Sequence, residues 1–299
     1  MARVIAREGQ ERRVDGIGQG DHLCLVYADD AEQRRVVTAY VRAGLSRGER
    51  VLYFADARAP REVLGWLRAE GVDPSTALTT GQLSVTTAAV GYLAFGAFDA
   101  HAVAQTLQAE VSDALSAGFT GLRVSGEMSW ALRDVPGADQ LGTYETAVNA
   151  VFAGQPASAI CQYDARRFSA AALDDTQRRH PGTVELAPLH LNSRLRVTPS
   201  FRCGQRMLRV QGTVDHHTIA AFAATLETVL GWPGDVWVDL GELEFIDLAG
   251  LRALAQTAAR LPAGRRMHLV ELAPLLCQVV NLAEFDDISS LTVTARDAA

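Results

Sequence analysis

The sequence contains no lysine, so its 28 basic residues other than histidine are all arginine. Without lysine the chain has no side-chain amine that could form a Schiff base with a carbonyl substrate, and it lacks the cation that a phosphate-binding loop places on the terminal phosphates of a nucleotide. Long apolar runs are absent too, since none approaches the roughly 18 unbroken apolar residues that a membrane span requires. Because the first residues alternate charges instead of leading into an apolar core, we expect a cytoplasmic protein with no membrane contact.

Cysteine is scarce, and its spacing excludes the compact metal and redox motifs. The four cysteines, Cys24, Cys161, Cys203 and Cys277, form no C-x-x-C pair. Each lies in or beside an apolar segment, so buried free thiols are expected. A surplus of positive charge is also missing, because the formal net charge is -7. This charge argues against direct binding of nucleic acid.

The chain is long and apolar enough for two cores, with 299 residues of which 48% are hydrophobic. Residues 1–19 are expected to form an N-terminal tail. Over residues 20–191 short apolar strands alternate with amphipathic helices, which predicts a doubly wound α/β domain with a mainly parallel sheet. Strands are predicted at 22–27, 50–56, 82–88, 121–128, 158–164 and 183–188. Helices are predicted at 30–48 and 99–118, the second between a capping Asp99 and Gly118.

Residues 192–206 are polar, contain Pro199 and break this rhythm, so we expect them to be a linker. Residues 207–297 alternate again and predict a smaller α/β domain, with about four strands and helices on one side. Its strands are expected at 206–214, 235–242, 265–272 and 289–294, and its helices at 217–231, 248–262 and 274–285.

The second unit carries the strings LRVQGTVD, WVDLGELEFIDLAGLRAL and MHLVELAPLLCQVVNLAEFDD in this order. Together they resemble the STAS domain, the fold of anti-sigma factor antagonists and of the regulatory tails of sulfate transporters. The resemblance implies an output domain that binds an anti-sigma factor or kinase, or another STAS protein. It also allows a homo-oligomer.

The junction at Asp247 lacks a group that the resemblance leads one to expect. Asp247 ends a strand and can accept N–H groups of the next helix, while Gly250 lets another segment approach closely. In the antagonists a phosphorylated Ser or Thr stands immediately before this glycine, where it would add a dianion to the docking surface. Here Ala249 and Leu248 hold no hydroxyl, so the usual switch is missing. The expected partner surface consists of Asp247, Leu248, Ala249, Gly250 and Leu251.

The first unit opens with LCLVYADDAEQRRVVTAYVRAGLSRGERVLYFAD, which resembles the start of RecA-like ATPases of the circadian-clock type. The glycine-rich loop is missing, because ADDAEQ has neither glycine nor lysine, and Asp29 and Asp30 would repel a triphosphate. The strings GDHLCLVY, GERVLYFAD, GLRVSGEMSWAL, YETAVNAVF, ICQYDARRF and RRHPGTV resemble the MEDS domain over nearly the whole unit. This resemblance implies a RecA-like sensory domain without a phosphate loop, which detects small hydrocarbon-like molecules.

A ligand of this domain is expected beyond the carboxyl ends of the parallel strands. Aromatic and carboxylate side chains at these ends could hold a small, mostly apolar molecule. Alternatively, the aromatic residues fill the core and the acids cap helices. The candidate residues are Tyr27, Asp29, Asp56, Glu127, Ser129, Trp130, Tyr163 and Asp164.

Two histidines and two cysteines form a second set of candidates. His22 and Cys24 point to one face of a strand, and Cys161 and His180 could lie near them as zinc ligands or redox thiols. Their spacing matches no compact zinc motif, and both histidines precede strands, at the end opposite the expected pocket. The main expectation is therefore buried thiols and hydrogen-bonded histidines, with no metal and no cofactor.

These observations predict a non-enzymatic signalling protein in which a sensory domain controls a STAS domain of the anti-sigma factor antagonist type. One alternative is an enzyme of RecA-like fold that binds a nucleotide or metal through Glu127. Another alternative is a structural scaffold that assembles through STAS contacts.

Overall fold

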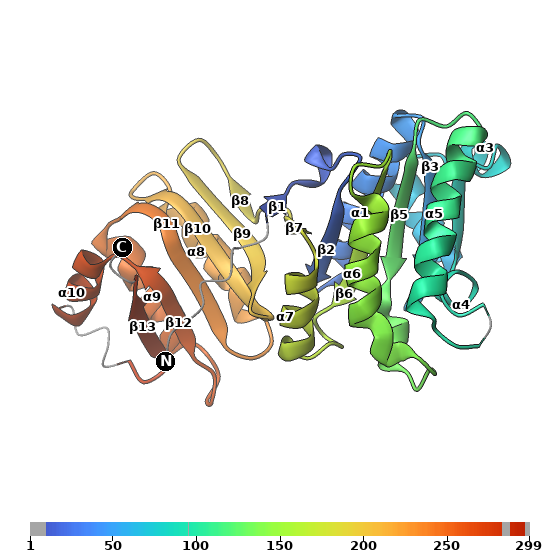
Figure 1. Cartoon of the computed structure of the whole chain (residues 1–299). Coiled ribbons are helices and arrows are strands. Elements are labelled where there is room, and N and C mark those ends of the chain that lie inside the picture. The colour runs from blue at the N-terminus through green and yellow to red at the C-terminus, as the bar shows by residue number, and fades with distance from the viewer. Residues whose placement is uncertain (1–9, 95, 283–287, 297–299) are drawn as a thin grey trace. The chain divides into compact units, whose positions relative to one another are not determined.

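The computed structural model describes residues 10–94, 96–282 and 288–296. The chain divides into two compact units, Met1–Glu185 and Leu186–Ala299 (Figure 1). Each unit contains its own sheet. The prediction of an α/β domain followed by a smaller α/β domain is confirmed.

The first unit is built on a parallel sheet whose described strands follow the order β1-β7-β2-β6-β5-β3-β4. The strands are β1 (Gln10–Arg12), β2 (His22–Tyr27), β3 (Arg50–Ala55), β4 (Leu83–Thr87), β5 (Leu122–Glu127), β6 (Ala157–Asp164) and β7 (Gly182–Val184). Strands β2, β5 and β6 are buried along their whole length. Burial on both faces is typical of a parallel sheet that is covered by two layers of helices.

Helices connect these strands as the sequence predicts. They are α1 (Asp30–Ser46), α2 (Pro60–Ala69), α3 (Ser75–Thr79), α4 (Ala88–Gly91), α5 (Ala100–Ser116), α6 (Leu141–Phe152) and α7 (Ala170–Arg179), with short 3₁₀ turns η1 (Val14–Gly16), η2 (Met128–Leu132) and η3 (Ala138–Gln140). Helices α1 and α2 pack together over one face, and α5, α6 and α7 lie over the other (Figure 1). The carboxylate of Asp99 caps α5, and Gly118 follows that helix with a φ of +86°.

The expectation of an N-terminal tail over residues 1–19 is wrong for the part that the structure describes; residues 1–9 lie outside the described residues. Residues 10–12 form β1, which pairs in parallel with β7, Gln10 opposite Gly182. A Cβ atom on Gly182 would stand 2.3 Å from the carbonyl oxygen of Gln10, so glycine is what allows this close approach. Three residues are too few to show an alternating pattern, and their partner is far away in the sequence.

The second unit holds a six-stranded sheet in the order β13-β12-β11-β10-β9-β8, counted over the described residues. Its strands are β8 (His190–Leu191), β9 (Leu195–Arg202), β10 (Gln205–Val214), β11 (Val236–Ile246), β12 (Met267–Leu272) and β13 (Leu291–Ala295), and its helices are α8 (Ile219–Leu230), α9 (Leu248–Ala259) and α10 (Pro274–Leu282). The four predicted strands pair in parallel. Residues 283–285 of the last predicted helix lie outside the described residues.

The linker predicted over residues 192–206 is instead part of this sheet. Strand β9 pairs antiparallel with both β10 and β8, which raises the sheet from the predicted four strands to six. Its Leu195 and Val197 are buried in the same hydrophobic cluster as Leu208 and Val210 of β10. The first unit accordingly ends at Glu185 rather than at residue 191. A proline lacks a donor but does not prevent a strand, and Pro199 lies opposite Leu208.

The core of the second unit comes close to α9 at Gly250. A Cβ atom on this buried glycine would lie 2.6 Å from Cγ1 of Ile246 and 2.8 Å from Cγ1 of Val214. Because such distances require neighbouring side chains to move, the helix packs at its present depth only with glycine at this position.

We predict that Gly250→Ala destabilises the second unit by about 1 to 3 kcal/mol through overpacking. The measurement is urea unfolding of the full chain, followed by circular dichroism. Gly231→Ala is the matched control, since a Cβ there meets only the Thr228 carbonyl oxygen at an ordinary 3.4 Å. Equal stability of the two variants would contradict the prediction.

Candidate functional site

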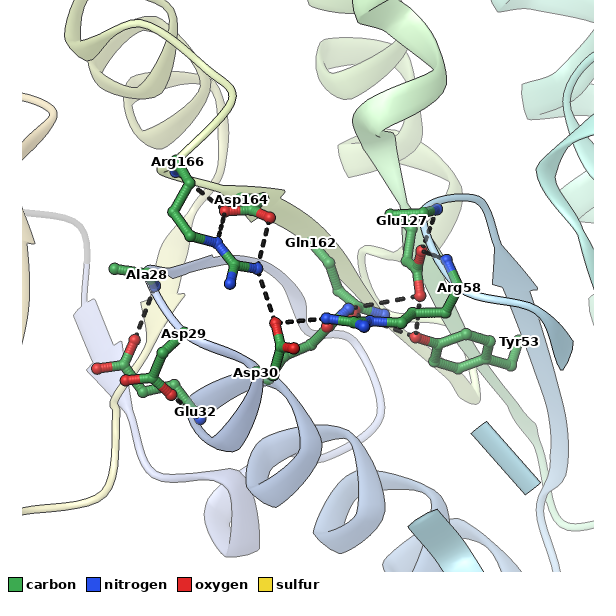
Figure 2. Close-up of polar contacts among 12 residues, drawn as sticks. Ala28, Asp29, Asp30, Glu32, Tyr53, Arg58, Glu127, Gln162, Asp164 and Arg166 are labelled. Carbon is green, nitrogen blue, oxygen red and sulfur yellow. Dashed lines mark hydrogen bonds and ion pairs between the residues drawn. The ribbon is translucent and has the colours of Figure 1, made fainter. Parts of the chain in front are cut away.

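A buried carboxylate, Glu127, joins the carboxyl ends of the central strands in the first unit (Figure 2). Its Oε1 accepts a hydrogen bond of 2.8 Å from the Tyr53 hydroxyl. Its Oε2 accepts from the backbone N–H groups that follow β3, at 2.9 Å from Asp56, 2.7 Å from Ala57 and 3.3 Å from Arg58. The side-chain amide of Gln33 also donates to Oε1, at 3.4 Å. Five donors within the protein therefore engage the carboxylate, and it fixes the turn after β3.

The environment of Glu127 affects its charge in two opposing ways. Burial raises its pKa above the ordinary value, while the hydrogen bonds from Asp56, Tyr53 and the neighbouring amides favour the ionised form and offset part of that rise. The side chain is 1% exposed. Glu127 therefore acts as an acceptor for the main chain in the described structure.

A network of ion pairs bridges the ends of β2 and β6. Asp30, the first residue of α1, pairs with both Arg58 and Arg166, the second at 2.8 Å. Arg166 also binds Asp164 through Nε and Nη2, at 2.8 and 2.7 Å. Figure 2 shows the two guanidinium groups converging on Asp30. Because the Asp30 and Arg166 side chains are 53% and 40% exposed, water weakens these pairs, and a ligand could replace them at small cost.

The eight residues predicted to line a pocket occupy separate environments. The guanidinium of Arg166 lies over the ring of Tyr27, with its carbon 5.9 Å from the ring centre. Asp29 caps α1 by accepting from the Glu32 amide at 2.8 Å. Asp56 accepts from the Ser129 hydroxyl at 2.8 Å. Together with Glu127 and Asp164, these side chains lie at the predicted edge of the sheet.

The two remaining aromatic candidates lie inside the core. Trp130 is fully buried, with its ring 5.6 Å from Tyr92 and 4.4 Å from Phe98. Tyr163 is fully buried as well and donates its hydroxyl to Glu145. The structure therefore gives both the packing role that the sequence analysis left open, and the edge of the sheet that remains for a ligand is mainly polar.

The histidine and cysteine candidates meet at the other end of β2, under α6 and α7. His22, Cys161 and His180 come together, and Glu145 of α6 joins them. Cys24, the register partner of Cys161, is not part of this compact group. Burial lowers the pKa of His22, which favours its neutral form.

Sequence reasoning missed Glu145, although a signal was available. Tyr144, Val148 and Phe152 mark the buried stripe of α6, and Glu145 lies beside Tyr144 and one turn before Val148. A carboxylate inside an apolar stripe needs a partner in the interior. Glu145 faces a pair of histidines, His22 and His180, which lie far from it in the sequence.

The predicted partner surface of the second unit starts at the N-cap of α9. Asp247 accepts from the backbone N–H of Gly250 at 2.9 Å. Leu248 and Ala249 are exposed, whereas Gly250 and Leu251 are buried beneath them. The predicted surface therefore consists of an exposed apolar first turn resting on a buried second layer.

These features define a protein of two α/β units, the first a doubly wound parallel sheet and the second a smaller mixed sheet. The first unit matches the family model described as the methanogen/methylotroph, DcmR sensory domain (MEDS) at residues 21–181, more than half of the chain. The chain belongs to the MEDS family. Residues 198–293 match a second model, described as Mlab, STAS domain. Both predicted domains are confirmed, and their combination is that of a regulatory signalling protein.

A curated relative supports this class. The chain is 27% identical over 170 residues to the transcriptional repressor DcmR of Methylorubrum extorquens, and the match covers 56% of this chain and 61% of the repressor. The chain thus spans less than two thirds of that relative's length.

Two solved structures are also similar to parts of the chain. An anti-sigma factor antagonist from Mycobacterium paratuberculosis matches at 24% identity and a TM-score of 0.30, over 35% of this chain and 87% of the other. A KaiC-like protein from Pyrococcus horikoshii matches at 12% identity and a TM-score of 0.45, over 67% of this chain and 99% of the other.

Among the described helices none has both the length and the apolar character to span a membrane.

We predict that Glu127→Gln lowers the free energy of unfolding by about 2 to 3 kcal/mol, because an amide nitrogen cannot accept and would face buried donors. Chemical unfolding of the full chain measures the effect. Glu70→Gln, at an exposed position after α2, is the control and should change stability by less than about 0.5 kcal/mol. If both variants match the unmodified chain, the carboxylate does not hold the turn after β3.

Proposed function

We propose that this chain is a non-enzymatic regulator in which the MEDS domain senses a small molecule and the STAS domain binds an anti-sigma factor or its kinase. The exposed apolar start of α9 is the observation that carries the proposal. The match to the STAS model and the regulatory relative support it.

The output surface extends on both sides of the Asp247 cap. Phe245, at the end of β11, is 52% exposed, and Leu248 is 43% exposed. A hollow of about 320 Å³ lies along the same helix, lined by Arg252, Ala255, Gln256, Ala259 and Ile288. Adjacent exposed apolar side chains beside a concave face are typical of a protein contact.

The contact does not depend on phosphorylation before Gly250. Ala249 is exposed where the antagonists carry a hydroxyl, and its methyl group accepts no phosphate. The surface is therefore permanently uncharged at this position. We therefore assign control of the contact to the sensory domain, the alternative being a STAS domain that binds its partner constitutively.

The input site is placed at the ends of β2 and β6. These neighbouring strands connect to opposite sides of the sheet, β2 toward β3 and β6 toward β7. Ligands of open α/β sheets bind at such a point. The Asp30, Arg58 and Arg166 network lies there and consists of weak, half-exposed ion pairs, which a small molecule with a polar group could displace.

Two observations favour regulation over the rival enzyme. Glu127, the residue on which RecA-like catalysis would rest, is engaged by five intramolecular donors. The segment between β2 and α1 offers a triphosphate two carboxylates and no cation.

We predict that Leu248→Asp weakens binding to the cognate anti-sigma factor or kinase at least about tenfold, because it buries an unpaired charge in the contact. The anti-sigma proteins encoded in the same genome are expressed one at a time, and their dissociation constants are measured by calorimetry. Ala249→Glu should weaken binding in the same direction, since it adds the negative charge that phosphorylation would supply.

The matched control is Leu275→Asp on α10, where the leucine is 71% exposed. It should leave the affinity unchanged. Equal losses in Leu248→Asp and Leu275→Asp, or binding by none of the candidate partners, would contradict the proposed output.

We also predict that native mass spectrometry of the chain, purified from the cells that make it, shows an added organic molecule that is released on unfolding. Arg166→Ala should lose this molecule, and Arg178→Ala, an exposed arginine of α7, should retain it. A spectrum that shows only the mass of the polypeptide and of inorganic ions would contradict the proposed input.

A further inference from the structure

Four buried side chains of the first unit direct one ligand atom each toward a common point. They are His22 at the start of β2, Glu145 of α6, Cys161 of β6 and His180 after α7, and their exposed fractions are 1%, 0%, 3% and 4%. The Nε2, Oε and Sγ atoms that face one another all lie within 4.8 Å. This cluster, which we call the His-Glu-Cys-His cluster, draws on two strands and two helices.

The hydrogen bonds around the cluster leave both histidine Nε2 atoms without a proton when the rings are neutral. His180 directs Nδ1 at the carbonyl oxygen of Thr176, 2.7 Å away. His22 directs Nδ1 at Oδ1 of Asn149, also at 2.7 Å. The amide nitrogen of Asn149 donates to the carbonyl of Arg179, so its oxygen must face His22. Each Nδ1 is therefore the protonated atom, and each Nε2 presents a lone pair.

These lone pairs face a carboxylate. Oε2 of Glu145 lies 3.1 Å from Nε2 of His180 and 3.3 Å from Nε2 of His22. Among the described residues, Oε2 of Glu145 and Nε2 of His180 have no hydrogen-bond partner. Buried lone pairs at contact distance repel one another unless a proton or a metal ion lies between them.

Three of the six ligand-to-ligand distances are close to those of a tetrahedral metal site, and all six are within 4.8 Å. Zinc bonds of about 2.0 to 2.3 Å give ligand-to-ligand edges of roughly 3.3 to 3.7 Å. Nε2 of His22 lies 3.3 Å from Sγ of Cys161, and the two distances to Glu145 are similar. Small adjustments of the side chains would complete the tetrahedron.

The groups behind the ligands are those that metal sites require. Metal-bound imidazoles donate their other N–H to a carbonyl or carboxylate oxygen, as His22 and His180 do here. Tyr163 donates to Oε1 of Glu145 and leaves Oε2 for the cluster. The second shell thus orients three of the four candidate ligands.

We propose that His22, Glu145, Cys161 and His180 bind one divalent transition-metal ion, of the zinc class, in the interior of the sensory domain. A thiolate, a carboxylate and two neutral imidazoles would balance the two positive charges, which leaves the buried site neutral. Mixed nitrogen, sulfur and oxygen ligands in a tetrahedral arrangement favour Zn²⁺ or its substitute Co²⁺ over Mg²⁺ and Ca²⁺.

All four positions would be protein ligands, so the ion would be structural rather than catalytic. It would tie α6 and α7 to β2 and β6, elements whose cluster residues lie far apart in the sequence. Binding would then couple directly to the stability of the first unit. This inference is independent of the proposed partner and ligand.

The test uses the full chain without a histidine tag. The chain is unfolded with chelator and refolded with Co²⁺, because the buried site requires opening to admit the ion. We expect one cobalt per chain, the visible absorption of tetrahedral Co²⁺ and a near-ultraviolet thiolate-to-cobalt charge-transfer band. Replacing Co²⁺ with Zn²⁺ should remove these bands and raise the Tm above that of the metal-free chain.

Cys161→Ser should lose the charge-transfer band, while the matched Cys24→Ser, which changes the register partner of Cys161, should retain it. Circular dichroism checks that each variant folds. The unmodified chain decides the question even if a variant does not fold: binding of less than about one tenth of an equivalent of Zn²⁺ or Co²⁺ after refolding would overturn the proposal. A band lost in Cys24→Ser and kept in Cys161→Ser would overturn the assignment of ligands.

Discussion

A carboxylate removed from water has to find donors or positive charge inside the fold, and the first unit meets this requirement in different ways. Glu127 is surrounded by amide and hydroxyl donors, so its charge is spread over the turn that follows β3. Glu49 pairs with the buried guanidinium of Arg123 at 2.7 Å. Glu145 has one hydroxyl donor and two imidazoles whose protons point elsewhere. Because its charge is compensated less completely, Glu145 is suited to bind a cation, whereas Glu127 and Glu49 support the fold.

The same constraint makes the edge after β2 unsuited to a triphosphate. Immediately after β2, where a phosphate-binding loop would need glycines and a cation, α1 begins with Asp29 as its cap and Asp30 as its first residue. The positive charge at this edge comes from Arg58 and Arg166, and both are directed at Asp30. Opposite charges therefore neutralise one another within the protein, in a half-exposed position where water makes the pairs weak. An edge built in this way favours exchange of ion-pair partners over tight binding of a triphosphate.

Local pattern predicted most of the fold, and non-local pairing accounts for part of what it missed. Apolar runs located β2, β5 and β6, and Asp99 and Gly118 marked the ends of α5 correctly. Strand β1 depends on a distant partner, since Gln10 pairs with Gly182. Strand β9 instead forms a local hairpin with β10 through the turn at Cys203 and Gly204, and the polar sequence with Pro199 led to the prediction of a linker there. The candidate site, too, was predictable only in part. Parallel topology brought the strand-end residues to one edge as expected, whereas the packing of Trp130 and the arrival of Glu145 opposite two histidines depend on which helices cover which strands.

The two candidate sites of the sensory domain lie at opposite ends of β2, with His22 at its start and Tyr27 at its end. A metal in the His-Glu-Cys-His cluster would hold α6 and α7 on the sheet through Glu145 and His180. Arg166 and Asp164 lie in the segment that leads into α7, so a fixed helix would limit how far this segment can move. The carboxyl edge of β6 would then respond to a ligand only within this limit. On this argument the ion sets the frame of the domain and the ion pairs supply its adjustable part, and removing the ion should loosen both.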